Sequence, residues 1–132
     1  MAAFSGARRG ELLALTWPDL DFNSCTIRIS KSLGKTSSGL IVKETKTAGS
    51  VRTINMPASV MAQARAWKAR QIKLRLKAGS LWRGQDNIFC QSDGYYMYPD
   101  SVTARFRDII RSHNACCRPG EELPEITLHG LR

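Results

Sequence analysis

Arginine, lysine and histidine stand at three places in this sequence where their types and spacing suit anion chemistry. The stretch ITLHGLR carries His129 and Arg132 as a His-x-x-Arg pair after a hydrophobic Ile-x-Leu lead-in. In SGARRGELLALTW, Arg8 opens an expected helix beside a glycine that allows close backbone approach, with Glu11 one turn on. An arginine placed there can present its planar fork to a phosphate, and the alternative is an ordinary i,i+3 ion pair.

The third place is a turn. The stretch KTAGSVRTI puts Lys46 between two expected strands, where a long ammonium side chain can swing toward a ligand. Taken alone, Lys46 fits a surface lysine equally well, and Lys43 is a competing choice for the same role.

Other motifs are weaker. LGKTSSG resembles the end of a phosphate-binding P-loop, but the glycine that this motif requires five residues earlier is replaced by Ile29. The cluster Tyr95, Tyr96 and Tyr98 suits packing around a turn, with base stacking as the alternative, and none of the three has an adjacent activating base.

The cysteines do not form a repeated C-x-x-C pattern, which favours reduced thiols over disulfides. His113, Cys116 and Cys117 could contribute to a zinc site, but adjacent cysteines seldom share one metal and a fourth ligand is not evident. The sequence therefore does not call for a metal or another cofactor.

Composition limits the class of protein. The chain has 132 residues, of which 42% are hydrophobic, enough for one domain with a core. Its formal net charge of +9 favours a polyanionic partner such as nucleic acid over a membrane surface. No apolar run approaches the roughly 20 residues that span a bilayer, and no signal peptide is evident. We expect a cytoplasmic protein.

The hydrophobic period changes along the chain and predicts an α+β fold. Residues 6–16 predict a helix that Pro18 stops, and residues 1–5 predict the end of an earlier helix. Alternating β-branched residues predict strands at 25–30, 39–44 and 51–56, forming a small three-stranded antiparallel sheet.

The second half predicts mainly helix. A helix follows Pro57 and closes at Gly79, and its apolar stripe is expected to hold the residues Val60, Ala64, Trp67, Leu74 and Ala78. Its cations suit a solvated face better than direct DNA contact. A short buried strand in NIFC and an Asp-Gly turn precede a second helix, which starts near Pro99 and whose apolar face comprises Val102, Phe106, Ile109 and Ile110.

In this order, the motifs resemble the catalytic domain of the tyrosine recombinases, the phage-integrase family, over about residues 4–132. GARRGELLALTWPDLDF and ITLHGLR are the most specific parts. The resemblance maps the family's catalytic residues onto Arg8, Lys46, His129 and Arg132. Lys46 is preferred over Lys43 because a threonine follows it and because it lies at the family's distance before Arg-Thr-Ile.

The resemblance implies a DNA-breaking and rejoining fold whose enzyme cuts DNA through a 3′-phosphotyrosine link. Arg8 and Arg132 would then bind the non-bridging oxygens of the phosphate, Lys46 would protonate the departing 5′-hydroxyl and His129 would assist proton transfer. No metal or small-molecule cofactor is needed. The partners would be duplex DNA and other recombinase protomers of the full-length protein.

The family continues past His-x-x-Arg to its nucleophilic tyrosine, so residues 1–132 are expected to form a partial catalytic domain. The arm-binding and core-binding region and the nucleophile region would lie outside it, and this chain alone would be inactive. The acidic linker ACCRPGEELPE before ITLHGLR also departs from the family pattern. The alternative is a non-catalytic DNA-binding remnant of a decayed prophage integrase.

Overall fold

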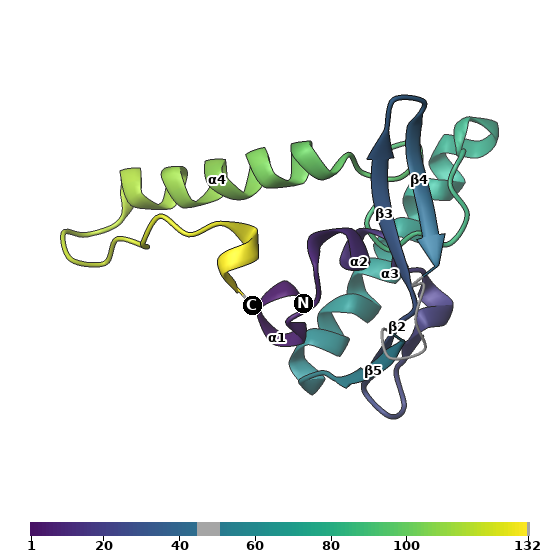
Figure 1. Cartoon of the computed structure of the whole chain (residues 1–132), viewed down its shortest axis with the longest axis horizontal. Helices are drawn as coiled ribbons and strands as arrows, with labels where there is room; N and C mark the ends of the chain where they lie inside the picture. Colours follow the sequence, from purple (N-terminus) through teal and green to yellow (C-terminus); the bar gives the residue numbers. More distant parts are fainter. Residues whose placement is uncertain (45–50, 132) are drawn as a thin grey trace.

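The fold starts with two short helices, and a glycine in the left-handed backbone conformation lies between them (Figure 1). This computed structural model describes residues 1–44 and 51–131. Helix α1 (Ala2–Ser5) ends at Gly6, whose φ of 56° few other residues adopt, and α2 (Arg9–Leu13) begins three residues later. The helix predicted over 6–16 is therefore present but shorter. Pro18 lies inside a separate 3₁₀ helix, η1 (Trp17–Asp19).

Strands form two antiparallel groups. Strands β1 (Leu20–Asp21), β2 (Thr26–Ile29) and β5 (Arg52–Asn55) make a three-stranded sheet in the order β1-β2-β5. Strands β3 (Lys31–Thr36) and β4 (Gly39–Glu44) make a hairpin. The predicted three-stranded sheet exists, but its expected membership was wrong, because β4 pairs with its neighbour β3 across a short turn. The polar, glycine-containing sequence of β3 concealed that partner.

Helix α3 (Ala58–Ala78) follows Pro57 and ends at Gly79, as predicted, before the short 3₁₀ helix η3 (Gly79–Leu81). Its buried residues include Val60 and Ala64 from the expected stripe, whereas Leu74 is 42% exposed. The buried Gln71 occupies the inner face instead. It accepts a hydrogen bond from Trp17 Nε1 at 2.6 Å and donates one to the Asn87 carbonyl at 2.8 Å.

Helix α4 (Pro99–Cys116) extends away from the rest of the fold, and the chain then returns alongside it to η4 (Leu128–Leu131), next to α1 (Figure 1). Its predicted apolar face is only partly covered, since Ile110 is buried and Ile109 is 56% exposed. The strand expected in NIFC is reduced to isolated bridges, one of which joins Cys90 to Tyr96.

The core lies where α2, the three-stranded sheet and α3 meet. Its most deeply buried large side chains are Ile27, Ile29, Met61 and Ile88. This core fixes the start of α2 and the first residue of β5 relative to each other, and both belong to the candidate site. None of the helices within the described residues is long and apolar enough to cross a membrane.

Candidate functional site

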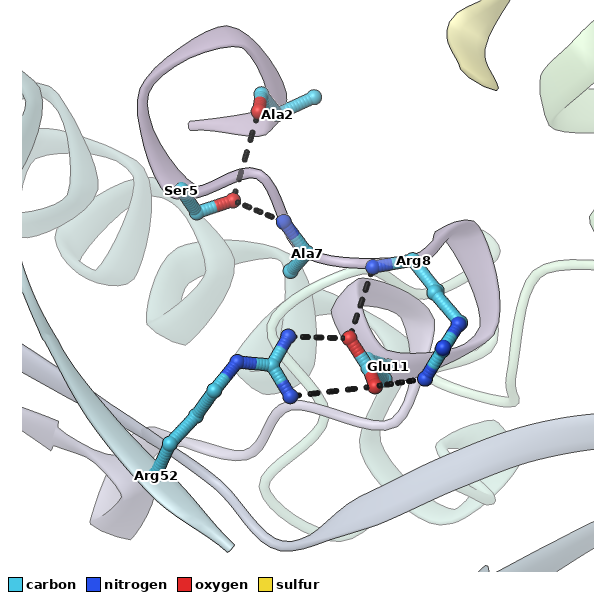
Figure 2. Close-up of polar contacts among 6 residues, drawn as sticks. All are labelled: Ala2, Ser5, Ala7, Arg8, Glu11 and Arg52. Carbon is cyan, nitrogen blue, oxygen red and sulfur yellow. Dashed lines mark hydrogen bonds and ion pairs between the residues drawn. The ribbon is translucent and has the colours of Figure 1, made fainter. Parts of the chain in front are cut away.

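Arg8 lies at the N-terminal boundary of α2, in an extended conformation with φ −69° and ψ 150°. The chain enters this position from α1, where the Ser5 hydroxyl accepts a hydrogen bond from the Ala7 N–H at 3.2 Å (Figure 2). The Arg8 side chain is 66% exposed. The prediction that Arg8 opens a helix is confirmed, and its guanidinium is accessible to an anion.

Glu11 is the centre of the polar contacts around Arg8 (Figure 2). Its side chain is 3% exposed. Oε2 accepts hydrogen bonds from the Arg8 backbone N–H and from Arg52 Nη2, both at 2.7 Å. Oε1 accepts from Arg8 Nη1 and from Arg52 Nη1, both at 3.3 Å. A buried carboxylate therefore joins the start of α2 to the start of β5.

The charges in this group stabilise one another. Burial by itself raises the pKa of Glu11, but hydrogen bonds from Arg52 and from the Arg8 backbone, together with the attraction of both guanidinium groups, outweigh burial and hold that pKa below its ordinary value. The hydrogen bond to Glu11 correspondingly raises the pKa of Arg52. Glu11 is thus an ionised, compensated anion at neutral pH.

His129 is exposed in η4, which packs against α1. It lines a pocket of about 250 Å³ formed by Ala7, Arg9, Thr103, Thr127, Leu128 and His129. Ala7 is the residue before Arg8, so the two sequence-predicted residues lie on adjoining segments. Arg9 fastens this region by donating from Nη1 to the Pro99 carbonyl at 3.1 Å and to the Thr103 hydroxyl.

Lys46 and Arg132 lie outside the described residues, and their place in the site stays a prediction. The competing residue Lys43 is exposed in β4, opposite Ser32 of β3.

The weaker sequence candidates have structural roles here. Tyr95 packs edge to face on Tyr96 with ring centroids 5.7 Å apart, and the Arg83 guanidinium lies 5.1 Å from the centroid of the Tyr95 ring. LGKTSSG forms part of the β3–β4 hairpin, whose turn is closed by the Thr36 hydroxyl and the Gly39 carbonyl. Within the described part of the chain, no group of His, Cys, Asp or Glu is arranged to hold a metal ion.

Sequence reasoning missed Arg52 and Arg9, and it treated Glu11 only as a helix ion-pair partner of Arg8. That pair is present, at 3.3 Å. The signal for a larger role was the position of Glu11 directly before Leu12 and Leu13, within the buried stretch of α2. An acidic residue in such a stretch needs a cation from another element.

Two curated proteins are similar to this chain, whereas no protein-family model matches it. A "Tyrosine recombinase XerC-like" protein of Caldanaerobacter subterraneus subsp. tengcongensis is 32% identical over 91 residues, which cover 62% of this chain and 23% of that protein. The "ICEBs1 integrase" of Bacillus subtilis is 27% identical over 133 residues, covering 100% of this chain and 33% of that protein. The chain therefore spans a third or less of these relatives.

Solved structures share the fold. The Tn1549 transposon integrase in complex with transposon right end DNA superposes with a TM-score of 0.76 at 28% identity, covering 98% of this chain and 40% of that one. The XerA recombinase, at 18% identity, has a TM-score of 0.62 over 98% of this chain and 37% of its own. In sequence and in fold, the chain is similar to proteins named as tyrosine recombinases and integrases, and its α+β architecture matches that of the Tn1549 integrase.

Proposed function

We propose that this chain is part of the catalytic domain of a site-specific DNA recombinase, which cuts and rejoins duplex DNA through a 3′-phosphotyrosine intermediate. The observation that carries the proposal is the position of Arg8 at the start of a helix. Its side chain is 66% exposed, and its backbone N–H donates a hydrogen bond to the buried Glu11. The names of the relatives and the DNA present with the Tn1549 integrase support it.

The chemistry requires positive charge and proton transfer around one phosphate. As the nucleophile attacks, negative charge builds on the non-bridging oxygens, and Arg8 and Arg132 would each give them bidentate hydrogen bonds. Lys46 would donate a proton to the departing 5′-hydroxyl, and His129 would hydrogen-bond the phosphate or assist that transfer. The energy of the broken phosphodiester is kept in the protein–DNA link, so the step needs no nucleotide or metal.

The nucleophile in this proposal is a tyrosine that follows the His-x-x-Arg pair. Tyr95, Tyr96 and Tyr98 precede that pair. Residues 1–132 would then supply the phosphate-binding part of the active site, and the complete recombinase would act together with other protomers. We therefore expect the 132-residue chain by itself to form no covalent link to DNA.

The test incubates the chain with nicked duplex DNA and looks for a protein–DNA adduct on a denaturing gel. The comparison is a longer chain that continues through the nucleophilic tyrosine implied by the family resemblance, with and without Arg8→Ala. We expect an adduct from the longer chain only, and its loss in the Arg8→Ala variant.

Two results would contradict the proposal. An adduct from the 132-residue chain would mean that Tyr95, Tyr96 or Tyr98 attacks the phosphate. A longer chain that still reacts normally after Arg8→Ala would remove Arg8 from the active site. A longer chain that binds DNA but never reacts would favour the non-catalytic remnant.

A further inference from the structure

Two arginines share the Glu11 carboxylate, and they share it unequally (Figure 2). Arg52 aims both terminal nitrogens at it, at 2.7 and 3.3 Å. The Arg8 guanidinium reaches it through Nη1 at 3.3 Å, while the shorter bond at 2.7 Å comes from the Arg8 backbone. The stronger guanidinium contact therefore belongs to Arg52, which is 34% exposed, and not to the more exposed Arg8.

This division matters because a buried carboxylate must be compensated. Two lysines of β3, which packs against α2, are paired with other carboxylates: Lys31 with Asp19 at 3.2 Å, and Lys35 with Asp100 at 3.2 Å. Within the described residues, the charged groups bonded to Glu11 are Arg8 and Arg52. Without Arg52, Arg8 alone among the described residues would remain bonded to Glu11, and its guanidinium would be drawn toward the carboxylate and away from solvent.

We propose that Arg52 is a positioning residue that neutralises Glu11 and thereby leaves the Arg8 guanidinium available for a DNA phosphate. The proposal rests on the phosphate-binding role proposed for Arg8. It also gives the two arginines different roles: Arg52 compensates the buried Glu11 carboxylate, and Arg8 binds a phosphate of the DNA.

The proposal has a pH signature that simple packing lacks. Replacing Arg52 by glutamine removes a hydrogen bond and an attraction that lower the pKa of Glu11, so burial raises that pKa. At neutral pH the ionised Glu11 then holds Arg8. As the pH falls, Glu11 gains a proton and releases Arg8 again, so DNA affinity lost at high pH returns at low pH.

The experiment measures the binding of the 132-residue chain to a fluorescent DNA duplex by anisotropy, at fixed low salt, between about pH 8.5 and about pH 5. We expect Arg52→Gln to weaken binding about fivefold at the upper end, the size of one exposed ion contact, and to recover toward the lower end. The double variant E11Q/R52Q lacks the charge that captures Arg8, so at the upper end it should bind DNA more tightly than Arg52→Gln does, with an affinity that no longer rises as the pH falls. Arg28→Gln removes the same charge from an exposed site on the neighbouring strand β2 and should cause a smaller loss that does not reverse as the pH falls.

A double-mutant cycle with Arg8→Ala completes the test. In the Arg8→Ala background, Arg52→Gln should add no further loss. If Arg52→Gln lowers DNA affinity equally at every pH, and Glu11→Gln does not restore that affinity, the proposal is overturned. Arg52 would then act directly on DNA or only through packing. Native-like binding by Arg8→Ala itself would instead contradict the proposed role of Arg8, so the two failures are distinguishable.

Circular dichroism on each variant gives the folded fraction. If Arg52→Gln lowers it, Arg52→Lys keeps the test decisive because lysine retains the charge at this position. We expect Arg52→Lys to bind DNA nearly as the native chain does at every pH. If Arg52→Lys lowers DNA affinity as much as Arg8→Ala does, the proposal is contradicted.

Discussion

At the scale of single residues, Glu11 shows how one buried charge organises an exposed one. The carboxylate is 3% exposed and accepts two hydrogen bonds at each oxygen, from Arg8 and Arg52. Removing one member of this group leaves a buried charge without its partner, and this lowers the free energy of unfolding far more than the loss of an exposed ion pair does. Stability at this site should therefore depend mainly on the buried Glu11, and the proposed phosphate contact should be made by the exposed Arg8 guanidinium.

The first prediction separates these two roles. Glu11→Gln keeps the shape of the side chain but removes the charge, and we expect it to lower the free energy of unfolding by about 1–3 kcal/mol. Arg8→Ala should change it by less than about 0.5 kcal/mol, because the side chain is mostly solvent-exposed. Urea unfolding at neutral pH measures both, with the exposed Glu121→Gln as a control. A larger loss for Arg8→Ala than for Glu11→Gln would contradict this assignment.

The second prediction concerns acid. The pKa values of Glu11 and Asp19 are both lowered. For Asp19, burial raises the pKa but is outweighed by hydrogen bonds from Thr16 and Lys31. A carboxyl whose pKa is lower in the folded state stabilises that state above its unfolded pKa, and this stability is lost as the pH falls through the folded value. The free energy of unfolding should therefore fall as the pH drops below the ordinary values of 4.5 for Glu and 3.8 for Asp.

Urea unfolding at a series of pH values checks the acid prediction. The double variant E11Q/D19N should be less stable than the native chain at neutral pH, and its stability should depend less on acid. If the native chain and the double variant lose stability equally as the pH falls, other carboxyl groups control the acid transition.

At the scale of elements, local chemistry made some boundaries predictable and left others hidden. Pro57, Gly79 and Pro99 act on their own backbone, so the limits of α3 and the start of α4 could be read from sequence. The pairing of β4 with β3 and the contact between Glu11 and Arg52 depend on tertiary packing. Arg8 was among the four predicted site residues because the start of its helix gives a local signal, whereas Arg52, which was not predicted, had none.

Gly10 provides the third prediction, because α2 packs directly on β3. A Cβ atom at Gly10 would lie 2.6 Å from the Leu33 carbonyl oxygen and 2.7 Å from Ser32 Oγ. Helix propensity alone predicts that Gly10→Ala would add about 1 kcal/mol of stability. The close backbone contact predicts the opposite sign, a loss of about 1–3 kcal/mol. Urea unfolding decides between them.

Gly34→Ala is the matched control for this contact. Gly34 lies in β3 itself, where an added Cβ would meet Ile41 atoms at 3.9 Å, an ordinary van der Waals distance. We expect it to be better tolerated than Gly10→Ala. Equal losses at the two positions would mean that the approach of α2 to β3 does not restrict Gly10.

At the scale of the whole molecule, the net charge is +9, and both long helices, α3 and α4, carry exposed cations. Arg107 and Arg111 of α4 line a hollow with residues 125–127, the segment that leads into His129. The cations in the second half of α3, such as Lys73 and Lys77, are exposed on a helix that sequence reasoning assigned to a solvated face. We therefore expect the α4 cations to contribute more to DNA binding than the cations in the second half of α3.

The last prediction uses salt to compare these two helices. Each phosphate contact that is lost should reduce the slope of log affinity against log salt by about 0.9. We expect neutralising Arg105, Arg107 and Arg111 to glutamine to weaken duplex binding strongly and to lower this slope by about 2–3. Neutralising Lys73, Arg75 and Lys77 removes the same charge from α3 and should change the slope less. Arg8→Ala should lower it by at most about 1, because a single arginine meets a single phosphate.

Anisotropy titrations from about 50 to about 200 mM salt measure all of these slopes. Equal effects of the two triple substitutions would indicate that DNA responds to overall charge and not to α4, and a larger effect at α3 would place the DNA on the other helix.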